Sequence, residues 1–317
     1  MKISIVTPSY NQAEFLQQTL CSVLESQPRP DEYFVMDGGS TDSSIEIIKT
    51  YQARLTKWVS EKDNGQADAI NKGFRMAGGD IIAWLNSDDY YLPGAIAQAI
   101  RAFEANPQVG LVYGDVLSVD QQGRIFNIQK FEQYSLADLM RFQIISQPAV
   151  FMRRSVLEKA GMLDMSFHYL LDHHLWLRVA LHTQILYIPQ ALAAARYHDK
   201  AKNLANTAEF GKEANRIVEW MQKTPGFAPL FMQNKNKILG GANRLNAFYL
   251  TDGGNYHKAL QAYWQAFKYD PLLVLRESHR VIYCLLALVG LRNLRDVYSA
   301  LRKKIKNINP DQHPPQT

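Results

Sequence analysis

Short apolar runs alternate with amphipathic helical patterns along the first 115 residues. The runs rich in β-branched and aromatic residues, which are typical of buried strands, are residues 3–7, 33–36, 58–60, 81–85 and 109–113. The segments with apolar residues at helical spacing are residues 15–24, 40–48, 66–76 and 93–103. Repeated strand–helix units predict an α/β fold, with a mostly parallel sheet flanked by helices on both faces.

The pattern loosens after Asp115 and becomes helical beyond Asn203. In the first of these parts we expect a hairpin turn at 120–123, helices at 156–160 and 170–181, and a strand at 185–188 that Pro189 ends. In the second part helices continue to about Lys306, with breaks at Gly253-Gly254 and Asp270-Pro271. The sequence therefore predicts a first domain over residues 1–200 and a helical C-terminal extension over residues 201–317.

Composition is that of a globular protein, with 47% apolar and 21% charged residues among 317. Two cysteines exclude a disulfide framework. The first residues lack the pattern of a signal peptide, and no run reaches about 18 apolar residues, so a cytoplasmic protein is expected. The net charge is +5, and the surplus is local, because residues 276–306 hold eight basic and two acidic residues.

Polar clusters follow three of the predicted strands. They are Pro8-Ser9-Tyr10-Asn11, Asp37-Gly38-Gly39-Ser40 and Asn86-Ser87-Asp88-Asp89. Ligands of parallel α/β sheets bind outside the carboxyl ends of the strands. Carboxylates gathered there repel unless a cation lies between them, and hard cations such as Mg²⁺ or Mn²⁺ prefer oxygen ligands. The alternative for both acidic clusters is helix capping alone.

Several nucleotide and hydrolase motifs are missing from the chain. A GxGxxG after the first strand, a GxxxxGK[ST] and a GxSxG are all absent. Their absence disfavours a dinucleotide-binding domain, a P-loop NTPase and an α/β-hydrolase.

The segments SIVTPSYNQAEFLQQTL, VMDGGSTD, SEKDNGQADAINKG and IIAWLNSDDYYLPGAI closely resemble the family 2 glycosyltransferases of the GT-A fold. The order and spacing of these segments match that family from Ile3 to about Ala97, and residues 147–180 resemble it too. The resemblance covers about the first 200 residues. It implies an enzyme that transfers a sugar from a nucleotide-diphosphate sugar.

The resemblance also implies the roles of individual residues. The donor-binding residues would be Pro8, Tyr10, Asn11, Asp37, Asp63, Asn86 and Ser87. Among these, Pro8, Tyr10 and Asp37 would line the nucleobase pocket, and Asp63 would help to hold the nucleoside. Asp88 would bind the Mg²⁺ or Mn²⁺ ion, and His198 would contact the metal or the diphosphate.

Asp172 matches the catalytic base of the family, and the alternative from the residues alone is a helix-start acid without chemistry. The adjacent His173 and His174 are expected to be supporting or surface groups rather than metal ligands. Two positions depart from the family pattern, since Asn86 replaces the first acid of the DxD motif and Leu171 replaces a frequent glutamate. The QxxRW motif of processive synthases is absent, which favours the transfer of single sugars.

The leading interpretation is an inverting, metal-dependent glycosyltransferase with a UDP-sugar as the favoured donor. Its acceptor would be a glycan or a lipid-linked molecule in the synthesis of cell-surface polysaccharide. The alternatives are a catalytically silent sugar-nucleotide-binding module and, less favoured, a nucleotidyltransferase.

The C-terminal tail carries a separate signal. A nine-residue apolar run, 281–289, precedes a pattern of apolar and basic stripes up to Lys306. We expect a helix from about His279 to Lys306 that holds the enzyme at an anionic membrane surface, on the inner face of the cell membrane. The alternative is a helix packed on the protein with a solvated basic face. Nucleic acid is disfavoured as a partner because no recognition motif accompanies the charge.

Overall fold

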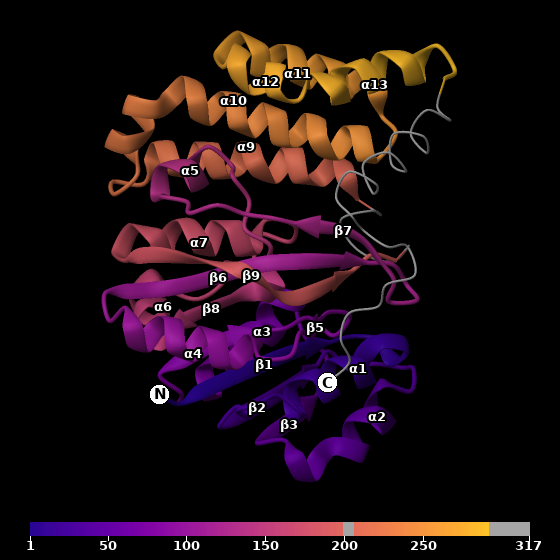
Figure 1. Ribbon diagram of the computed structural model, residues 1–317, viewed down its shortest axis with the longest axis vertical. Helices are drawn as coiled ribbons and strands as arrows, with labels where there is room; N and C mark the ends of the chain where they lie inside the picture. The colour runs from indigo at the N-terminus through magenta and orange to yellow at the C-terminus, as the bar shows by residue number, and fades with distance from the viewer. Residues whose placement is uncertain (199–205, 292–317) are drawn as a thin grey trace. The chain divides into compact units, whose positions relative to one another are not determined.

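The computed structural model describes residues 1–198 and 206–291 of the chain (Figure 1). The contacts among these residues gather into two units. The α/β unit contains residues 1–135 and 145–196, and the helical unit contains residues 136–144 and the described residues from 197 onward. The sequence patterns did not indicate that the short segment 136–144 joins the helices.

One mixed sheet forms the centre of the α/β unit, with the strand order β3-β2-β1-β4-β8-β6-β9-β5 and with β7 paired to β6 (Figure 1). The strands are β1 (Ile3–Ser9), β2 (Glu32–Asp37), β3 (Lys57–Ser60), β4 (Ile81–Trp84), β5 (Tyr90–Tyr91), β6 (Val109–Val119), β7 (Ile125–Gln129), β8 (Val150–Arg153) and β9 (Gln184–Arg196). The part β3-β2-β1-β4 is parallel, as predicted. Strand β8 then pairs antiparallel with both β4 and β6, while β6 and β9 are parallel.

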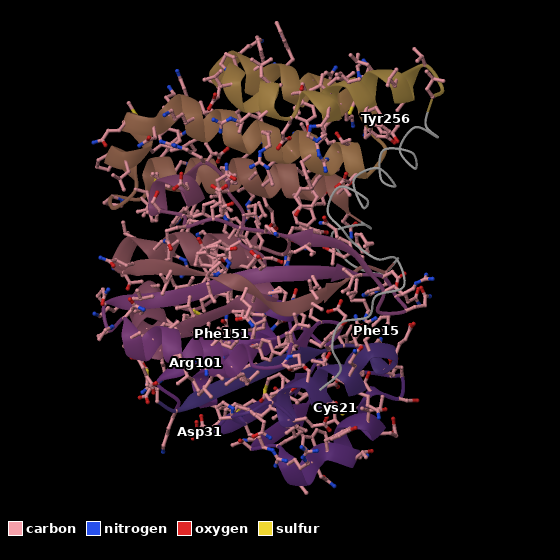
Figure 2. All side chains as sticks on the ribbon, viewed as in Figure 1. Phe15, Cys21, Asp31, Arg101, Phe151 and Tyr256 are labelled. Carbon is pink, nitrogen blue, oxygen red and sulfur yellow. The ribbon has the colours of Figure 1, made fainter. Side chains whose placement is uncertain are left out.

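Helices lie between these strands in the chain. They are α1 (Ala13–Leu24), α2 (Ser44–Tyr51), α3 (Gln66–Met76), α4 (Ala95–Ala105), α6 (Arg154–Ala160) and α7 (Leu171–His182), with short 3-10 turns η1 (Gln52–Arg54) and η2 (Gln147–Ala149). Buried apolar side chains from the strands and from α1 and α4 form the main core. Within it, the rings of Tyr91 and Phe151 stack with their centroids 5.3 Å apart (Phe151 is labelled in Figure 2).

Strand β9 contradicts one prediction, because Pro189 does not end it. The strand continues to Arg196, and its pairing with β6 shifts where Ile188 faces Gly114 and Ala191 faces Asp115. Pro189 therefore lies in a bulge, where a residue without an N–H group removes no ladder hydrogen bond. The extension matters for the site because the end of β9 pairs with β5, directly after the acidic residues at 88–89.

The helical unit consists of α5 (Leu136–Met140), α9 (Thr207–Lys223), α10 (Ala228–Asp252), α11 (Tyr256–Tyr269), α12 (Pro271–Arg276) and α13 (Ser278–Leu288). The breaks predicted at Gly253-Gly254 and Asp270-Pro271 are confirmed. The side chain of Asp270 accepts a hydrogen bond from the Leu273 N–H at 3.2 Å and caps α12.

The helix expected from His279 to Lys306 ends at Leu288 instead. Gly290 follows with a φ of +89°, a left-handed conformation that favours glycine and does not continue a helix. The rest of the expected helix, residues 292–306, lies outside the described residues. Within residues 1–198 and 206–291, none of the helices combines the length and apolarity needed to cross a membrane.

Candidate active site

Asp37 ends β2, and its buried carboxylate accepts four hydrogen bonds from residues nearby. Oδ2 accepts from the N–H groups of Gly39 and Ser40, at 3.1 and 2.9 Å, and from Ser60 Oγ at 2.7 Å. Oδ1 accepts from Ser40 Oγ at 2.5 Å. These donors hold the carboxylate in one orientation at the carboxyl edge of the sheet. Asp37 therefore closes the loop after β2 and does not cap α2, which begins at Ser44, and these bonds use much of the acceptor capacity of Asp37.

Asn11 links the loop after β1 to the loop after β2. Its N–H donates to Ser40 Oγ at 2.8 Å, and its side-chain Oδ1 accepts from the Thr41 N–H at 2.8 Å. Asn11 has a φ of +51°, which asparagine tolerates better than most residues do. Tyr10, directly before it, is 60% exposed, whereas Pro8 is buried within β1. The predicted donor residues of the first cluster therefore lie together, with the Tyr10 ring available to a ligand.

Asp63 lies beside the loop after β2. A Cβ atom on Gly38 would lie 2.6 Å from Asp63 Oδ2, so only glycine at this position allows the carboxylate to approach so closely. Asp63 Oδ1 also accepts a hydrogen bond from the Gly65 N–H at 2.8 Å. Asp37 and Asp63 line one small hollow together with Lys72, whose Nζ contacts Glu61 Oε1 at 2.8 Å. The structure thus brings together the two acids that were assigned to the nucleoside.

The loop after β4 is joined to this edge by Asn86. Gln66 Nε2, at the start of α3, donates to Asn86 Oδ1 at 2.7 Å, and Asn86 Nδ2 donates to Gln147 Oε1 at 3.1 Å. Gln147 Nε2 in turn donates to the Trp84 carbonyl oxygen at 2.7 Å. The Asn86 amide is hydrogen-bonded at both ends, and it therefore organises the loop.

Asp88 is half-buried, and Asp89 is almost fully buried. Burial raises the pKa of the Asp89 carboxyl well above its ordinary value, and the neighbouring charge of Asp88 adds to this. Asp89 Oδ1 accepts the Arg196 N–H at 3.0 Å. The carbonyl oxygens of Ser87 and Asp89 both accept from Thr19 Oγ1 of α1, at 2.9 and 2.7 Å. The main chain around Asp88 is therefore fixed on both sides.

Arg196 is a buried cation that sequence reasoning did not select. Its Nε donates to the Asp88 carbonyl oxygen at 3.3 Å, and its Nη1 donates to the carbonyl oxygens of Asp120 and Gln121 at 3.2 and 2.9 Å. Its Nη2 donates to Gln18 Oε1. The guanidinium also lies 4.8 Å from the ring centre of Phe15, labelled in Figure 2.

Asp172 lies in the first turn of α7 and is half-buried. One turn later, Trp176 stacks on Trp84 of β4, with ring centroids 5.2 Å apart. Residues four apart share a helix face, so this stack aligns the face that carries Asp172 with the carboxyl end of β4. His173 and His174 are both buried, which removes the surface alternative and leaves the supporting role.

His198 is buried and belongs to the helical unit, since the division between units falls after Arg196. Its part in metal or diphosphate binding stays a prediction.

The oxygen donors of the loop after β4 suit a hard cation that shares its shell with a ligand. Among residues 1–198 and 206–291, no group of three or more His, Cys, Asp or Glu side chains is arranged to hold a metal by itself. Asp88 offers one half-buried carboxylate in the loop after β4, and Asp37 and Asp63 line a hollow at the carboxyl ends of the neighbouring parallel strands. Mg²⁺ and Mn²⁺ sites of this kind use one or two carboxylates and take their other ligands from phosphate and water.

A mixed α/β sheet with acidic loops at the carboxyl ends of β2 and β4 agrees with the glycosyltransferase class that the sequence resembles, and the comparisons show this class. The family model described as Glycosyl transferase family 2 matches residues 4–161. An uncharacterised glycosyltransferase of Mycobacterium tuberculosis is 32% identical over 187 residues, which cover 56% of this chain and 69% of that protein. The chain belongs to glycosyltransferase family 2.

Three further proteins are similar to this chain. The O-antigen biosynthesis protein RfbC of Myxococcus xanthus is 29% identical over 61% of this chain and 16% of its own length. The crystal structure of Staphylococcus aureus TarS 1-349 in complex with UDP-GlcNAc has a TM-score of 0.63 at 17% identity, covering 93% of this chain and 92% of that one. The mannosyltransferase PcManGT of Pyrobaculum calidifontis, in complex with GDP-Man and Mn²⁺, has a TM-score of 0.57 at 18% identity, covering 97% and 88%. The two solved structures establish that the fold is shared.

Proposed function

We propose that this glycosyltransferase binds a nucleotide-diphosphate sugar with a divalent cation and transfers the sugar with inversion of the anomeric centre. The observation that carries the proposal is the bridge from Gln66 to Asn86, 2.7 Å long, which ties the acidic loop after β4 to the edge that bears Asp37 and Asp63. One ligand can then contact both acidic clusters. A sugar nucleotide has the required parts, a base and ribose at one end and a diphosphate at the other.

Each group of residues has a separate task in the proposed reaction. Asp37, Asp63, Tyr10 and Asn11 bind the nucleoside, and Asp88 faces the diphosphate. A bound Mg²⁺ or Mn²⁺ would neutralise the charge of the leaving diphosphate. Asp172 takes the proton of the acceptor hydroxyl. At the same time the hydroxyl oxygen forms the bond to the anomeric carbon, and the bond from that carbon to the diphosphate breaks.

Two finer parts of the proposal come from the similar proteins. A UDP-sugar is the favoured donor because TarS is solved with UDP-GlcNAc, although PcManGT is solved with GDP-Man. The acceptor is proposed to be a glycan or a lipid-linked molecule in polysaccharide synthesis, because RfbC is described as an O-antigen biosynthesis protein. We place the enzyme on the inner face of the cell membrane, where a lipid-linked acceptor would be reached.

Donor binding is tested by thermal melting with UDP, GDP or TDP in the presence of Mg²⁺ or Mn²⁺. We expect at least one pair to raise the melting temperature, and Asp88→Ala to remove the part that depends on the metal. The matched control is Asp80→Ala, because Asp80 precedes β4 and therefore lies at the opposite end of the strand from Asp88. If no nucleotide–metal pair shifts the melting temperature of the unaltered protein, the proposed donor site is wrong.

The proposed base is tested by Asp172→Asn, which keeps the shape of the side chain but removes its ability to accept the proton. Turnover should fall roughly 10²–10⁴-fold while the KM for the donor changes little. Glu158→Gln is the control, since Glu158 is an exposed acid on α6 that pairs with Arg154. Transfer by Asp172→Asn at the rate of the unaltered enzyme would remove Asp172 from the mechanism.

A further inference from the structure

Exposed apolar side chains are concentrated at one end of the helical unit. Fifteen large apolar or aromatic side chains are exposed among the described residues, and ten of them lie between Trp264 and Leu291. Exposed apolar residues in soluble proteins are normally scattered, and a concentration of them marks an interaction site. The sequence predicted the apolar run 281–289. The structure adds that several side chains in this run are at least half exposed.

The exposed residues of α12 and α13 are spaced to share helix faces. We define the outer apolar surface as Leu272, Leu275, Ile282, Leu285, Leu288 and Val289, which are between 50% and 72% exposed. On α13 the spacing of Ile282, Leu285 and Leu288 puts these three on one side, while Cys284 and Ala287 are buried on the other. Figure 1 shows α11, α12 and α13 in one layer on α10, on the side of α10 away from α9. Helix α13 is therefore apolar on both its packed and its outward side.

The part of the chain that contains this surface is basic, since its described residues 256–291 hold four Lys or Arg and two Asp or Glu. Residues 256–317 contain ten Lys or Arg and four Asp or Glu, whereas residues 1–255 contain 25 Lys or Arg and 26 Asp or Glu. The whole net charge of the protein thus lies in the C-terminal fifth of the sequence, and six of its ten basic residues follow Leu291, outside the described residues. Residues 256–291 also expose aromatic side chains, since Trp264 is 58% exposed and stacks on Phe267 with centroids 5.8 Å apart.

We propose that the outer apolar surface binds an anionic lipid bilayer by lying in its interfacial layer. A bilayer accepts apolar side chains below the headgroups, cations at the anionic headgroups and indole rings at the boundary between them. A second copy of this chain fits less well, because contact between two such surfaces would bring like charges together. This inference rests on the proposed membrane location and names the residues that would produce it.

The structure also shows which positions can be changed without removing buried side chains. Truncation before Arg276 would remove Cys284 and Ala287 from the core of the helical unit, together with the pair of Arg280 and Asp252, whose atoms are 3.2 Å apart. Point substitutions at outward-facing positions avoid this. The triple variant Ile282→Ser, Leu285→Ser, Leu288→Ser removes apolar surface, and Met232→Ser is the matched control because Met232 is 70% exposed on α10.

The experiment is flotation of the full-length protein with vesicles of phosphatidylcholine, with or without about 30 mol% phosphatidylglycerol. We expect the unaltered protein to float with the anionic vesicles at low salt, and less well at high salt or with neutral vesicles. The triple variant should lose on the order of tenfold or more of the partitioning, while Met232→Ser floats like the unaltered protein. The melting temperature of each variant checks that it is folded.

Three results would overturn the proposal. They are an unaltered protein that ignores anionic vesicles at low salt, a folded triple variant that still floats, and self-association that the triple variant abolishes. Metal-dependent hydrolysis of sugar nucleotides, measured on the same samples without vesicles, reports on the enzyme separately. If hydrolysis continues while flotation fails, only the membrane surface is wrong.

Discussion

At the scale of the residue, Arg196 fixes the shape of the acidic loop after β4. Its main-chain N–H binds Asp89, and its guanidinium binds the Asp88 carbonyl oxygen and, through Asp120 and Gln121, the turn between β6 and β7. Removing the guanidinium group would leave these carbonyl oxygens without their hydrogen-bond donors. We therefore assign Arg196 as a positioning residue for Asp88.

The variant Arg196→Lys keeps the charge but loses the planar set of donors. The concentration of Mn²⁺ needed for half-maximal activity should rise roughly 10–100-fold, the range seen when an outer-shell partner is lost. Arg153→Lys is the control, because Arg153 also donates to carbonyl oxygens, of Val109 and Phe103, and lies over the Phe103 ring. Both variants should melt at lower temperature. Equal metal requirements for the two variants would show that Arg196 is only structural.

The sequence predicted the acids of the site better than their partners. Asp37, Asp63 and Asp88 follow strands whose carboxyl ends share an edge, so the topology alone indicates that they converge. Arg196 could not be placed in this way, because its position depends on the register of β9 with β6 and β5, which no local pattern encodes. The burial of His173 and His174 was missed for a related reason, since α7 is buried on most of its circumference.

At the scale of the element, the parallel strands were predictable because each contains a short run of apolar residues that polar or turn-forming residues follow. The antiparallel insertion of β8 between β4 and β6 was not, since residues 150–153 carry the same kind of apolar run as a parallel strand would. Pro189 led to the opposite error, because the strand that it was expected to end is longer than predicted. A proline argues against a strand only where its missing N–H would be needed, and the bulge between Ile188 and Ala191 removes that need.

Helix α3 packs on β1 through Gly73, and this contact allows a test of close packing. A Cβ atom at Gly73 would lie 2.4 Å from Val6 Cγ1, so Gly73→Ala should destabilise the α/β unit by about 1–3 kcal/mol. That cost outweighs the gain of about 1 kcal/mol in helix propensity. Urea denaturation measures the change in free energy of unfolding.

Val6→Ala supplies the control, because it removes the methyl groups that would clash. In the Val6→Ala background, Gly73→Ala should cost at least about 1 kcal/mol less than it does alone, as expected for coupled neighbours. Strictly additive effects would mean that the contact between Gly73 and Val6 does not limit how closely α3 approaches β1.

At the scale of the whole molecule, acid should act first on the α/β unit. Four carboxyl groups with a lowered pKa lie there, Asp42, Asp68, Asp120 and Asp164. Burial acts to raise each pKa, but hydrogen bonds outweigh it, such as those from Asn64 to Asp68 and from the Ser166 N–H to Asp164. A lowered pKa in the folded state means that the charged form stabilises the fold above the unfolded pKa near 4, and that this stability is lost as the pH falls.

The Asp89 carboxyl has the opposite effect on stability as the pH falls. Because its pKa is raised, the folded state binds a proton more tightly than the unfolded state does. This offsets part of the stability lost at the other four groups. With four groups against one, we expect the protein to become less stable between about pH 5 and pH 3. Pulse-labelled amide exchange after incubation at about pH 6 and about pH 3 would locate the loss. Protection should fall in β1, β2 and α3 before it falls in α9 and α10. Simultaneous loss in both units, or earlier loss in α9 and α10, would show that the carboxyl groups of the α/β unit do not govern acid stability.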